Sequence, residues 1–280
     1  MKLRILIAAA VALLAFSGTA YAQSGLPADE AGMFLVVCGP TMTQQIDPIM
    51  DPGMAMSAHM HTFFGHQGVT NSSTPQSIAG GSTACHLGED SSAYWAPTAY
   101  RTDTGQQVTP KNGFAYYLGS PGQSVQPIPA GLEMVGGHPN GTAPFQLGSK
   151  LMVRFACNNG VYKTQPYDCR PYGSSAFVEA IVLFPFCWDG HGLTPNDVTY
   201  GDGNGVCPPG FPVKLEQLRL NEKYKGFQRG DLLRFSSGNA YTFHADFMNG
   251  WQESKLDSLT KGCLDTHRMC IEVSDKNPGP

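Results

Sequence analysis

Phe177-Val178-Glu179-Ala180-Ile181-Val182-Leu183-Phe184-Pro185-Phe186-Cys187 is a run that is apolar almost throughout. Its apolar side chains occupy both odd and even positions, and many of them are β-branched or aromatic. A run of this kind is typical of a strand that is covered on both faces, whereas a surface strand alternates apolar with polar residues. We therefore expect residues 177–187 to form a strand of the buried core.

Shorter strand-like runs lie on both sides of this core strand, separated by turns rich in glycine and proline. They cover residues 33–38, 92–100, 113–118, 132–137, 151–157, 213–218 and 232–235, with long loops at 67–88 and 191–212. One helix is expected near residues 251–262, where Leu256 and Leu259 stand three apart and Gly262 can end it. The pattern predicts a mainly β, single-domain antiparallel β-sandwich or jelly-roll-like fold with long loops and one short C-terminal helix.

The eight cysteines form an even set, which in an exported protein is typical of a disulfide framework. No two of them have the CxxC spacing on which thiolate zinc sites usually draw. Spacing alone permits many pairings. Joining near neighbours pairs Cys157 with Cys169, Cys187 with Cys207 and Cys263 with Cys270, which leaves Cys38 for Cys85.

The beginning of the chain has the parts of a secretory signal. Met1-Lys2-Leu3-Arg4 is charged, residues 5–16 are apolar, and Ala20-Tyr21-Ala22 fits a cleavage site. We expect residues 1–22 to be the signal peptide and residues 23–280 to form one secreted β-rich domain. No other run is long and apolar enough to span a membrane. The expected location is secreted or periplasmic, and we expect a monomer.

The charge of the chain says little about its partners except by exclusion. The formal net charge is -4, and only 14% of the residues are charged. No stripe of basic residues is present to contact phosphates, so nucleic acid is excluded as the expected partner.

The stretch with the most chemistry runs from residue 47 to residue 65, Asp-Pro-Ile-Met-Asp-Pro-Gly-Met-Ala-Met-Ser-Ala-His-Met-His-Thr-Phe-Phe-Gly. His59 and His61 are two positions apart. On an extended backbone, side chains alternate between faces, so both imidazoles would project to the same side.

A second segment, residues 241–247, repeats this pattern. Apolar residues alternate there with polar ones that include His244 and Asp246, as in a half-buried strand. Polar groups buried on strand faces cost about 1–3 kcal/mol each when they lack partners. We therefore expect His59 and His61 to face His244 and Asp246, with at least two imidazoles within about 4–6 Å of Asp246 or of each other.

Five blocks of the chain together resemble the secreted fungal and bacterial family known as the domain of unknown function DUF1996. The blocks are Asp47-Pro48-Ile49 with Pro52-Gly53, residues 57–61 with Phe64-Gly65, Tyr94-Trp95-Ala96-Pro97 with Tyr100, residues 184–190, and residues 244–251. The resemblance implies export, one domain and a common site without a settled reaction. Fungal members are often fused to carbohydrate- or wall-binding modules, which implies a polysaccharide or cell-wall glycan as the partner. The chain departs from the family pattern at His66 and at Asp90-Ser91-Ser92-Ala93.

The candidate catalytic residues are His59, His61, His244, Asp246 and Asp47. The three imidazoles can hold a divalent metal such as Zn, Cu or Ca, with Asp246 as a further ligand or as the group that orients a histidine. Without a metal, one imidazole can transfer a proton at a sugar carbon or glycosidic oxygen while another histidine or Asp47 stabilises charge. Asp47 can also serve only as a turn cap, which is common for Asp before proline.

The candidate substrate-binding residues lie in the family blocks: Tyr94, Trp95, Trp188, Asp189, Asn249 and Trp251. Sugar rings stack on aromatic planes, so these tryptophans suit a glycan cleft, although large aromatic side chains also fill cores. Asp189 and Asp246 can form the carboxylate pair that glycoside hydrolysis requires.

Three classes of function are therefore open. The first is an exported lyase or hydrolase that acts on a polysaccharide by histidine and aspartate acid-base chemistry, with or without a metal. The second is a non-catalytic protein that binds a glycan or cell wall through its tryptophans. The third is a secreted copper- or zinc-binding protein, because Met50, Met54, Met56 and Met60 accompany the histidines and methionine sulfur suits Cu(I). Methionine as packing filler is the ordinary alternative.

Overall fold

The predicted core strand is β12 (Val178–Leu183), and all six of its residues are buried. The computed structural model describes residues 32–270, so the predicted signal peptide and its cleavage site lie outside the described residues. β12 belongs to a six-stranded sheet that is antiparallel except where β1 runs parallel to β19. The order of this sheet is β11 (Val153–Ala156), β12, β16 (Gln217–Tyr224), β7 (Asn112–Leu118), β1 (Met33–Cys38) and β19 (Met269–Cys270).

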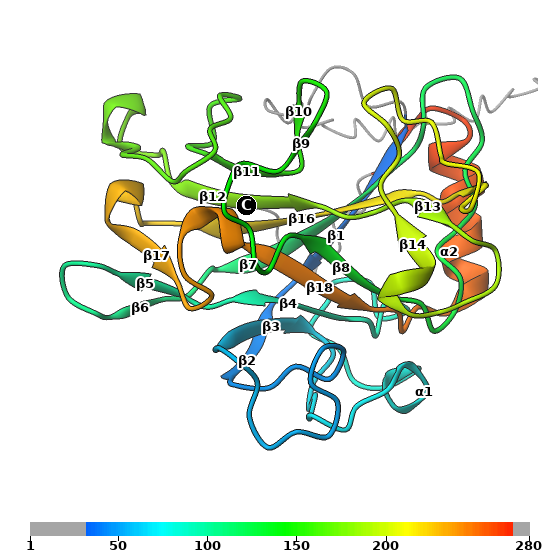
Figure 1. The fold of residues 1–280 in the computed structure, drawn as a ribbon, viewed down its shortest axis with the longest axis horizontal. Helices are drawn as coiled ribbons and strands as arrows, with labels where there is room; N and C mark the ends of the chain where they lie inside the picture. The colour runs from blue at the N-terminus through cyan, green and yellow to red at the C-terminus, as the bar shows by residue number, and fades with distance from the viewer. Residues whose placement is uncertain (1–31, 271–280) are drawn as a thin grey trace, which may run out of the picture.

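A second sheet has five strands, and every neighbouring pair in it is antiparallel. Its order is β2 (Pro40–Gln44), β3 (His61–Gly65), β4 (Ala93–Pro97), β18 (His244–Met248) and β8 (Glu133–Gly137). Figure 1 shows it as the layer below the six-stranded sheet, with β2 and β3 at its lower edge. The segment that contains the two early histidines therefore leads into this second sheet.

The two sheets pack face to face around one apolar core, as strand alternation requires. Phe64, Tyr94 and Phe247 enter the core from the five-stranded sheet. Val182 and Leu220 enter it from the six-stranded sheet. The predicted antiparallel β-sandwich is thus confirmed.

Smaller elements surround the sandwich. The remaining strands form three small sheets. The first contains β5 (Ala99–Arg101), β6 (Gln107–Val108) and β17 (Leu233–Phe235), and the second contains β13 (Cys187–Trp188), β14 (Val198–Thr199) and β15 (Val213–Lys214). The third pairs β9 (Gln146–Leu147) with β10 (Lys150–Leu151). One-turn helix α1 (Pro75–Ile78) lies within the predicted loop 67–88. The predicted C-terminal helix is α2 (Glu253–Leu259), which continues as a π-helical turn, Thr260–Leu264, so Gly262 lies inside that turn and does not end the helix.

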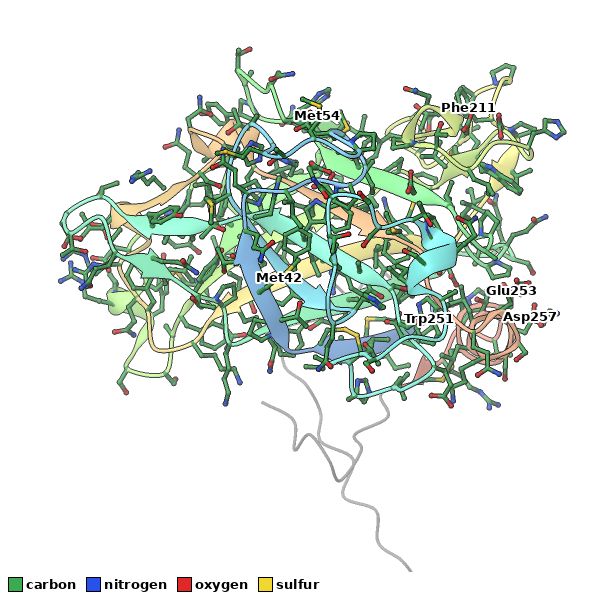
Figure 2. All side chains as sticks on the ribbon, turned by 90° about the horizontal axis from the view of Figure 1, so that it is seen from below. Met42, Met54, Phe211, Trp251, Glu253 and Asp257 are labelled. Carbon is green, nitrogen blue, oxygen red and sulfur yellow. A yellow bond between two sulfur atoms is a disulfide. The ribbon has the colours of Figure 1, made fainter. Side chains whose placement is uncertain are left out.

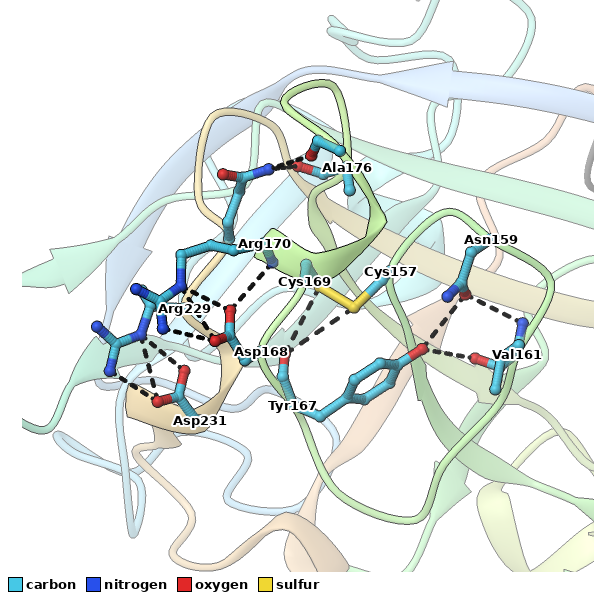
Figure 3. Close-up of a disulfide and its surroundings, with 12 residues drawn as sticks. Cys157, Asn159, Val161, Tyr167, Asp168, Cys169, Arg170, Ala176, Arg229 and Asp231 are labelled. Carbon is cyan, nitrogen blue, oxygen red and sulfur yellow. Dashed lines mark hydrogen bonds and ion pairs between the residues drawn. A yellow bond between two sulfur atoms is a disulfide. The ribbon is translucent and has the colours of Figure 1, made fainter.

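All four predicted disulfides are present. They join Cys38 to Cys85, Cys157 to Cys169, Cys187 to Cys207 and Cys263 to Cys270, and no cysteine among the described residues is free. Figure 3 shows the bond between Cys157 and Cys169 close to the backbone carbonyl of Tyr167. Disulfides of this number agree with an oxidising compartment. Within residues 32–270, no helix is both long and apolar enough to cross a membrane.

The outer face of the five-stranded sheet is covered by chain rather than by a third sheet. Phe63, Trp95 and Met248 on this face form a small apolar cluster, against which Ile46 and Ile49 pack. The loop between β2 and β3, residues 45–60, and α1 therefore lie over this face, as the lower part of Figure 1 shows. The loop of residues 45–60, which we call the covering loop, therefore places the polar residues that precede β3 against the sheet.

Candidate functional site

His61 and His244 lie on the outer face of the five-stranded sheet, on the two strands that flank β4. On β18, His244 is two residues from Asp246, which pairs with Trp95 of β4, and Trp95 in turn pairs with Phe63 of β3. Because side chains alternate along strands, His61, His244 and Asp246 share one face. The exposed fraction is 0% for His61 and 1% for His244, so the sheet presents both imidazoles to the covering loop and not to solvent.

His59 belongs to the covering loop and not to a strand, since β3 begins at His61. The loop is held there by Ser57, whose backbone N–H donates to the carbonyl of Gln45 and whose hydroxyl donates to the carbonyl of His59. His59 is partly exposed, unlike the two strand histidines. It is therefore the imidazole through which the site reaches solvent.

The three imidazoles converge. The ring centroids of His59 and His61 are 4.4 Å apart, those of His59 and His244 5.1 Å, and those of His61 and His244 5.9 Å. One nitrogen of each ring lies within 4.8 Å of one nitrogen of each of the others. The predicted convergence of the two segments is confirmed, although most of the chain lies between them.

Backbone carbonyls fix the tautomers of the two strand histidines. His61 Nδ1 lies 2.9 Å from the carbonyl oxygen of Ile46, and His244 Nδ1 lies 2.8 Å from that of Thr242. A carbonyl oxygen only accepts, so each neutral ring carries its hydrogen on Nδ1 and keeps a lone pair on Nε2. The Nε2 atoms of His59 and His61 are buried and have no hydrogen-bond partner among the described residues.

We call His59, His61 and His244 the imidazole cluster. Two carboxylates lie beside it. Asp47 Oδ2 is 3.9 Å from His61 Nε2, and Asp246 Oδ2 is 3.8 Å from His244 Nε2. Oxygens of Asp47 and Asp246 and a nitrogen of His61 all lie within 4.8 Å of one another. Asp47 also caps a turn, because its Oδ1 accepts the backbone N–H groups of residues 49 and 50, while its Oδ2 faces His61.

Burial shifts the protonation equilibria of the whole group. Desolvation lowers the pKa of His244 to about 4 and that of His61 well below its usual 6.5, and the neighbouring imidazoles lower the pKa of His61 further. Desolvation raises the pKa of Asp47 to about 6 and that of Asp246 well above its usual value. Both oxygens of Asp246 are buried without a hydrogen-bond partner among the described residues, and Asp246 itself is 0% exposed.

Two further acids, Asp51 and Glu133, lie at the partly exposed edge of the site, which we call the rim, and were not among the predicted site residues. Burial lowers the pKa of His59 below its usual 6.5, and the negative charge of Asp51 opposes this shift. The charge of Asp51 adds to the burial that raises the pKa of Asp47, and the charge of Asp47 adds to the burial that raises the pKa of Glu133. Asp51 and Glu133 are both partly exposed. Asp51 lies within residues 47–65, the stretch that contains His59 and His61, so the sequence could have indicated it as a site residue. Glu133 was not predictable, because only the pairing of β8 with β18 brings it to this face.

The predicted substrate-binding aromatics are mostly internal. Trp95 and Tyr94 are both 0% exposed, and Trp95 stacks on Phe63 while Tyr94 points into the core. Trp251 is 5% exposed and donates its indole N–H to the Tyr117 hydroxyl. Packing accounts for Trp95 and Tyr94, which offer no free face to a sugar, whereas Trp251 is nearly buried but lines two cavities.

The other predicted binding residues serve turns and chain connections. Asn249 is 3% exposed and donates to the carbonyls of Ile128 and Pro129. Asp189 accepts the backbone N–H groups of residues 191 and 192, and Trp188, which is half-buried, donates to the carbonyl of residue 192. The structure does not bring Asp189 into the carboxylate group around Asp246.

The departures from the family pattern also have structural roles. Asp90 is fully buried, and its carboxylate accepts the hydroxyl of Tyr94 and the backbone N–H of Ser92. The Tyr94 hydroxyl meets that of Tyr117 at 2.7 Å, so a buried hydrogen-bonded chain runs on to Trp251. This chain was missed in the sequence, where its members are widely separated.

Two cavities lie away from the imidazole cluster. Their volumes are about 350 Å³ and 590 Å³, and they share Trp251, Glu253 and Ser254 at the start of α2. Figure 2 places the labelled Trp251 and Glu253 at one side of the molecule, apart from Met54 on the covering loop. Neither cavity is lined by a residue of the imidazole cluster.

The donor set fits a transition metal better than calcium. Three neutral imidazole nitrogens suit zinc or copper, whereas calcium takes six to eight oxygen ligands. Hydrogen bonds from Nδ1 to backbone carbonyls are the usual way in which metal-binding histidines are oriented. The orphaned Nε2 atoms and the unpartnered carboxylate of Asp246 are the polar groups that a bound cation would satisfy.

The comparisons with known proteins give one match. The model of the family described as "Domain of unknown function (DUF1996)" matches residues 47–251. This range begins at Asp47, ends at Trp251 and contains the imidazole cluster with both carboxylates. Neither the comparison with curated proteins nor that with solved structures gives a match.

Proposed function

The chain belongs to the DUF1996 family, whose description names no activity, and from this premise we propose that it is an exported, metal-dependent enzyme that acts on a polysaccharide or cell-wall glycan. The observation that carries the proposal is the convergence of three imidazole nitrogens within 4.8 Å beside a buried carboxylate without partners. Such a group is unfavourable when it is empty and becomes favourable around a cation.

Each residue has a role that its contacts support. His61 and His244 present Nε2 lone pairs, because their Nδ1 atoms donate to backbone carbonyls, and His59 completes the set from the covering loop. The metal would act as a Lewis acid and lower the pKa of bound water toward neutrality. Asp47, whose Oδ2 lies 3.9 Å from His61 Nε2, is placed to accept a proton. Asp246, whose Oδ2 lies 3.8 Å from His244 Nε2, would be a further ligand to the ion, because the Thr242 carbonyl already orients His244.

A glycan as the substrate is supported by the place of the site. His59 and Asp51 are partly exposed on the covering loop, so a polymer can reach this edge of the site without entering a deep cavity, while His61, His244 and Asp246 lie buried beneath the loop. The wall-binding modules that accompany fungal members point the same way. The alternative of a non-catalytic binder loses the support of Trp95, which is fully buried, and keeps that of Trp251, which lines two cavities away from the imidazole cluster.

A secreted copper-binding protein is the second candidate, and one observation favours it. Met50, Met54 and Met56 are 55–61% exposed on the loop that carries His59, so they do not serve as core packing. Exposed thioethers are soft ligands that favour Cu(I). This candidate predicts copper in the purified protein and no turnover of any polysaccharide.

The first test measures metal and turnover together. We expect protein purified without chelator to contain about one zinc or copper ion per chain, and its metal-free form to rebind that ion with 1:1 stoichiometry in a calorimetric titration. His61→Gln and His244→Gln should each weaken metal binding by at least about 100-fold, because each removes a ligand from a three-ligand site. Release of reducing ends from a panel of glycans should fall in parallel.

The matched control is His66→Gln. His66 is also buried, at 8% exposure, and follows β3, but it lies outside the imidazole cluster. This variant should bind the metal as the parent does. If zinc and copper both fail to bind, or if the His61 and His66 variants behave alike, the metal-dependent mechanism is excluded. Turnover that persists without metal would favour acid-base catalysis by the imidazoles alone.

A further inference from the structure

We propose that the surface around the imidazole cluster selects a polysaccharide that carries ammonium groups, that is, a polymer of amino sugars, and rejects polymers of uronic acids. This inference rests on the proposed function for the polymer being a glycan. It concerns the charge of the substrate and does not depend on which metal is bound.

The first step is the excess of negative charge. Oxygens of Asp47 and Asp246 lie with a nitrogen of His61 within 4.8 Å of one another. Asp51 is in the same turn as Asp47, to whose carbonyl its backbone N–H donates, and Glu133 lies on the same sheet face as Asp246. No Lys or Arg among the described residues forms an ion pair with any of them. The sequence contains no Lys or Arg from residue 5 to residue 100, and none in β8 or β18.

The second step is that a bound cation would balance this negative charge. Asp246 is completely buried with both oxygens unpartnered, and His61 Nε2 beside it is equally buried and unpartnered. A divalent ion in the imidazole cluster would balance the two inner carboxylates, Asp47 and Asp246. Asp51 and Glu133 at the rim are then left without a counter-charge on the side that faces solvent.

The third step concerns what this rim attracts. Two carboxylates near a partly desolvated surface attract a sugar ammonium group and repel a sugar carboxylate, and salt screens both effects. Arg170 and Arg229 are paired with Asp168 and Asp231 at another part of the molecule (Figure 3).

The fourth step is the apolar contact that a sugar ring needs. Met50, Met54 and Met56 are exposed on the covering loop next to Asp51, and Met54 is labelled in Figure 2. Flexible thioether side chains adapt to irregular surfaces and are common at binding sites. They supply the apolar surface for sugar C–H groups that the buried tryptophans do not.

The test compares four hexasaccharides on the metal-loaded protein by calorimetric titration at pH 6. They are built from glucosamine, N-acetylglucosamine, glucose and galacturonate. We expect the glucosamine hexamer to bind about tenfold more tightly than its N-acetylated form at low salt, and the preference to vanish at about 0.5 M salt because charges are screened. The galacturonate hexamer should not bind measurably.

Two rim variants and one control identify the residues. Asp51→Asn and Glu133→Gln should each reduce the preference for glucosamine severalfold without changing the metal stoichiometry. Glu253→Gln is the matched control, because Glu253 is an exposed acid at the start of α2, apart from the covering loop in Figure 2, and its removal should leave the preference unchanged.

Several results would overturn the inference. Equal binding of the glucose and glucosamine hexamers, tight binding of galacturonate, or equal loss of preference in the Glu253 and Asp51 variants would each do so. If hexalysine binds as tightly as the glucosamine hexamer, the rim binds any positively charged chain and does not select a sugar. If glucosamine is preferred but no metal binds, the charge inference stands and the metal-dependent mechanism fails.

Discussion

Buried acids without a positive partner are the residues whose chemistry departs most from their ordinary behaviour in this molecule. Asp246 is one of them, and Glu222 is another that lies far from the imidazole cluster in sequence. Glu222 is 1% exposed in the six-stranded sheet, where Oε2 accepts the Tyr224 hydroxyl and Oε1 has no partner among the described residues. Desolvation raises the pKa of Glu222 to about 8.

This raised pKa makes stability depend on pH. A carboxyl group whose pKa is higher in the folded than in the unfolded chain binds more protons when folded, so the free energy of unfolding falls as pH rises from about 4.5 to about 8. His59, His61, His66 and His244, whose pKa values burial lowers, oppose this slope up to about pH 7.5, because the unfolded chain still binds protons on them there. The contribution of Glu222 is therefore read as the difference between the slopes of parent and variant. We expect Glu222→Gln to remove a slope of up to about 1.4 kcal/mol per pH unit.

Urea unfolding at several pH values between 6.5 and 8 measures this slope. The parent should lose stability faster than the variant as pH rises, and Glu253→Gln, which changes an exposed acid, should behave as the parent does. Glu216 is also fully buried with a pKa near 8, so the variant should keep part of the slope. Parallel pH profiles for the parent and Glu222→Gln would contradict the assignment.

At the scale of single elements, the turn that ends β3 shows how closely the chain segments approach. Gly65 has φ of +80°, and a Cβ added there would overlap the carbonyl oxygen of Ser92 and lie 3.2 Å from the Cys85 sulfur. Gly68 has a similar φ, +85°, but a Cβ there would meet nothing within 4 Å. The two glycines therefore separate backbone strain from steric overlap.

We expect Gly68→Ala to cost about 1–2 kcal/mol of stability, because only the positive φ is penalised. Gly65→Ala should cost several kcal/mol more, because the overlap with β4 forces the backbone of the sheet apart. Thermal melts of the two variants check the difference. Equal melting temperatures would mean that β3 can move away from β4 at no cost.

Element positions were largely predictable, and the reasons for the exceptions are physical. The alternation of residues 241–247 and the apolar run at 177–187 predicted β18 and β12, because period and composition report burial directly. β18 begins only at His244, because Ala240–Thr242 form a 3-10 turn. His59 was predicted on a strand, yet it lies in the loop before β3, because the covering loop turns at residues 51–59. The burial of the tryptophans was not predictable, since it depends on which chain segments cover each sheet face.

At the scale of the whole molecule, the disulfides tie distant parts of the sandwich together. Three pairs were predicted from spacing, because near neighbours in sequence are the partners that short turns bring together, and the fourth, Cys38 with Cys85, was the pair that remained. The bond between Cys38 and Cys85 spans 47 positions and joins β1 to the long loop before β4, whereas that between Cys263 and Cys270 spans 7.

Loop-closure entropy predicts that the longer span stabilises more. Replacing Cys38 and Cys85 by Ala should cost about 4 kcal/mol, and replacing Cys263 and Cys270 about 2.5 kcal/mol. Urea unfolding of the two double variants measures the difference. A larger loss in the C-terminal pair would mean that packing at that bond, and not chain entropy, dominates.

The strand order β3-β4-β18 has a further consequence for how the molecule is made. β4 and β18 are neighbours in the sheet, but four strands of the six-stranded sheet, β7, β11, β12 and β16, are encoded between them. Contacts between segments so distant in sequence form slowly, because a long loop must close first. The three imidazoles therefore meet only after the C-terminal part of the polypeptide has been synthesised and has docked. A growing chain still on the ribosome has no such cluster, so any ion is acquired where folding finishes.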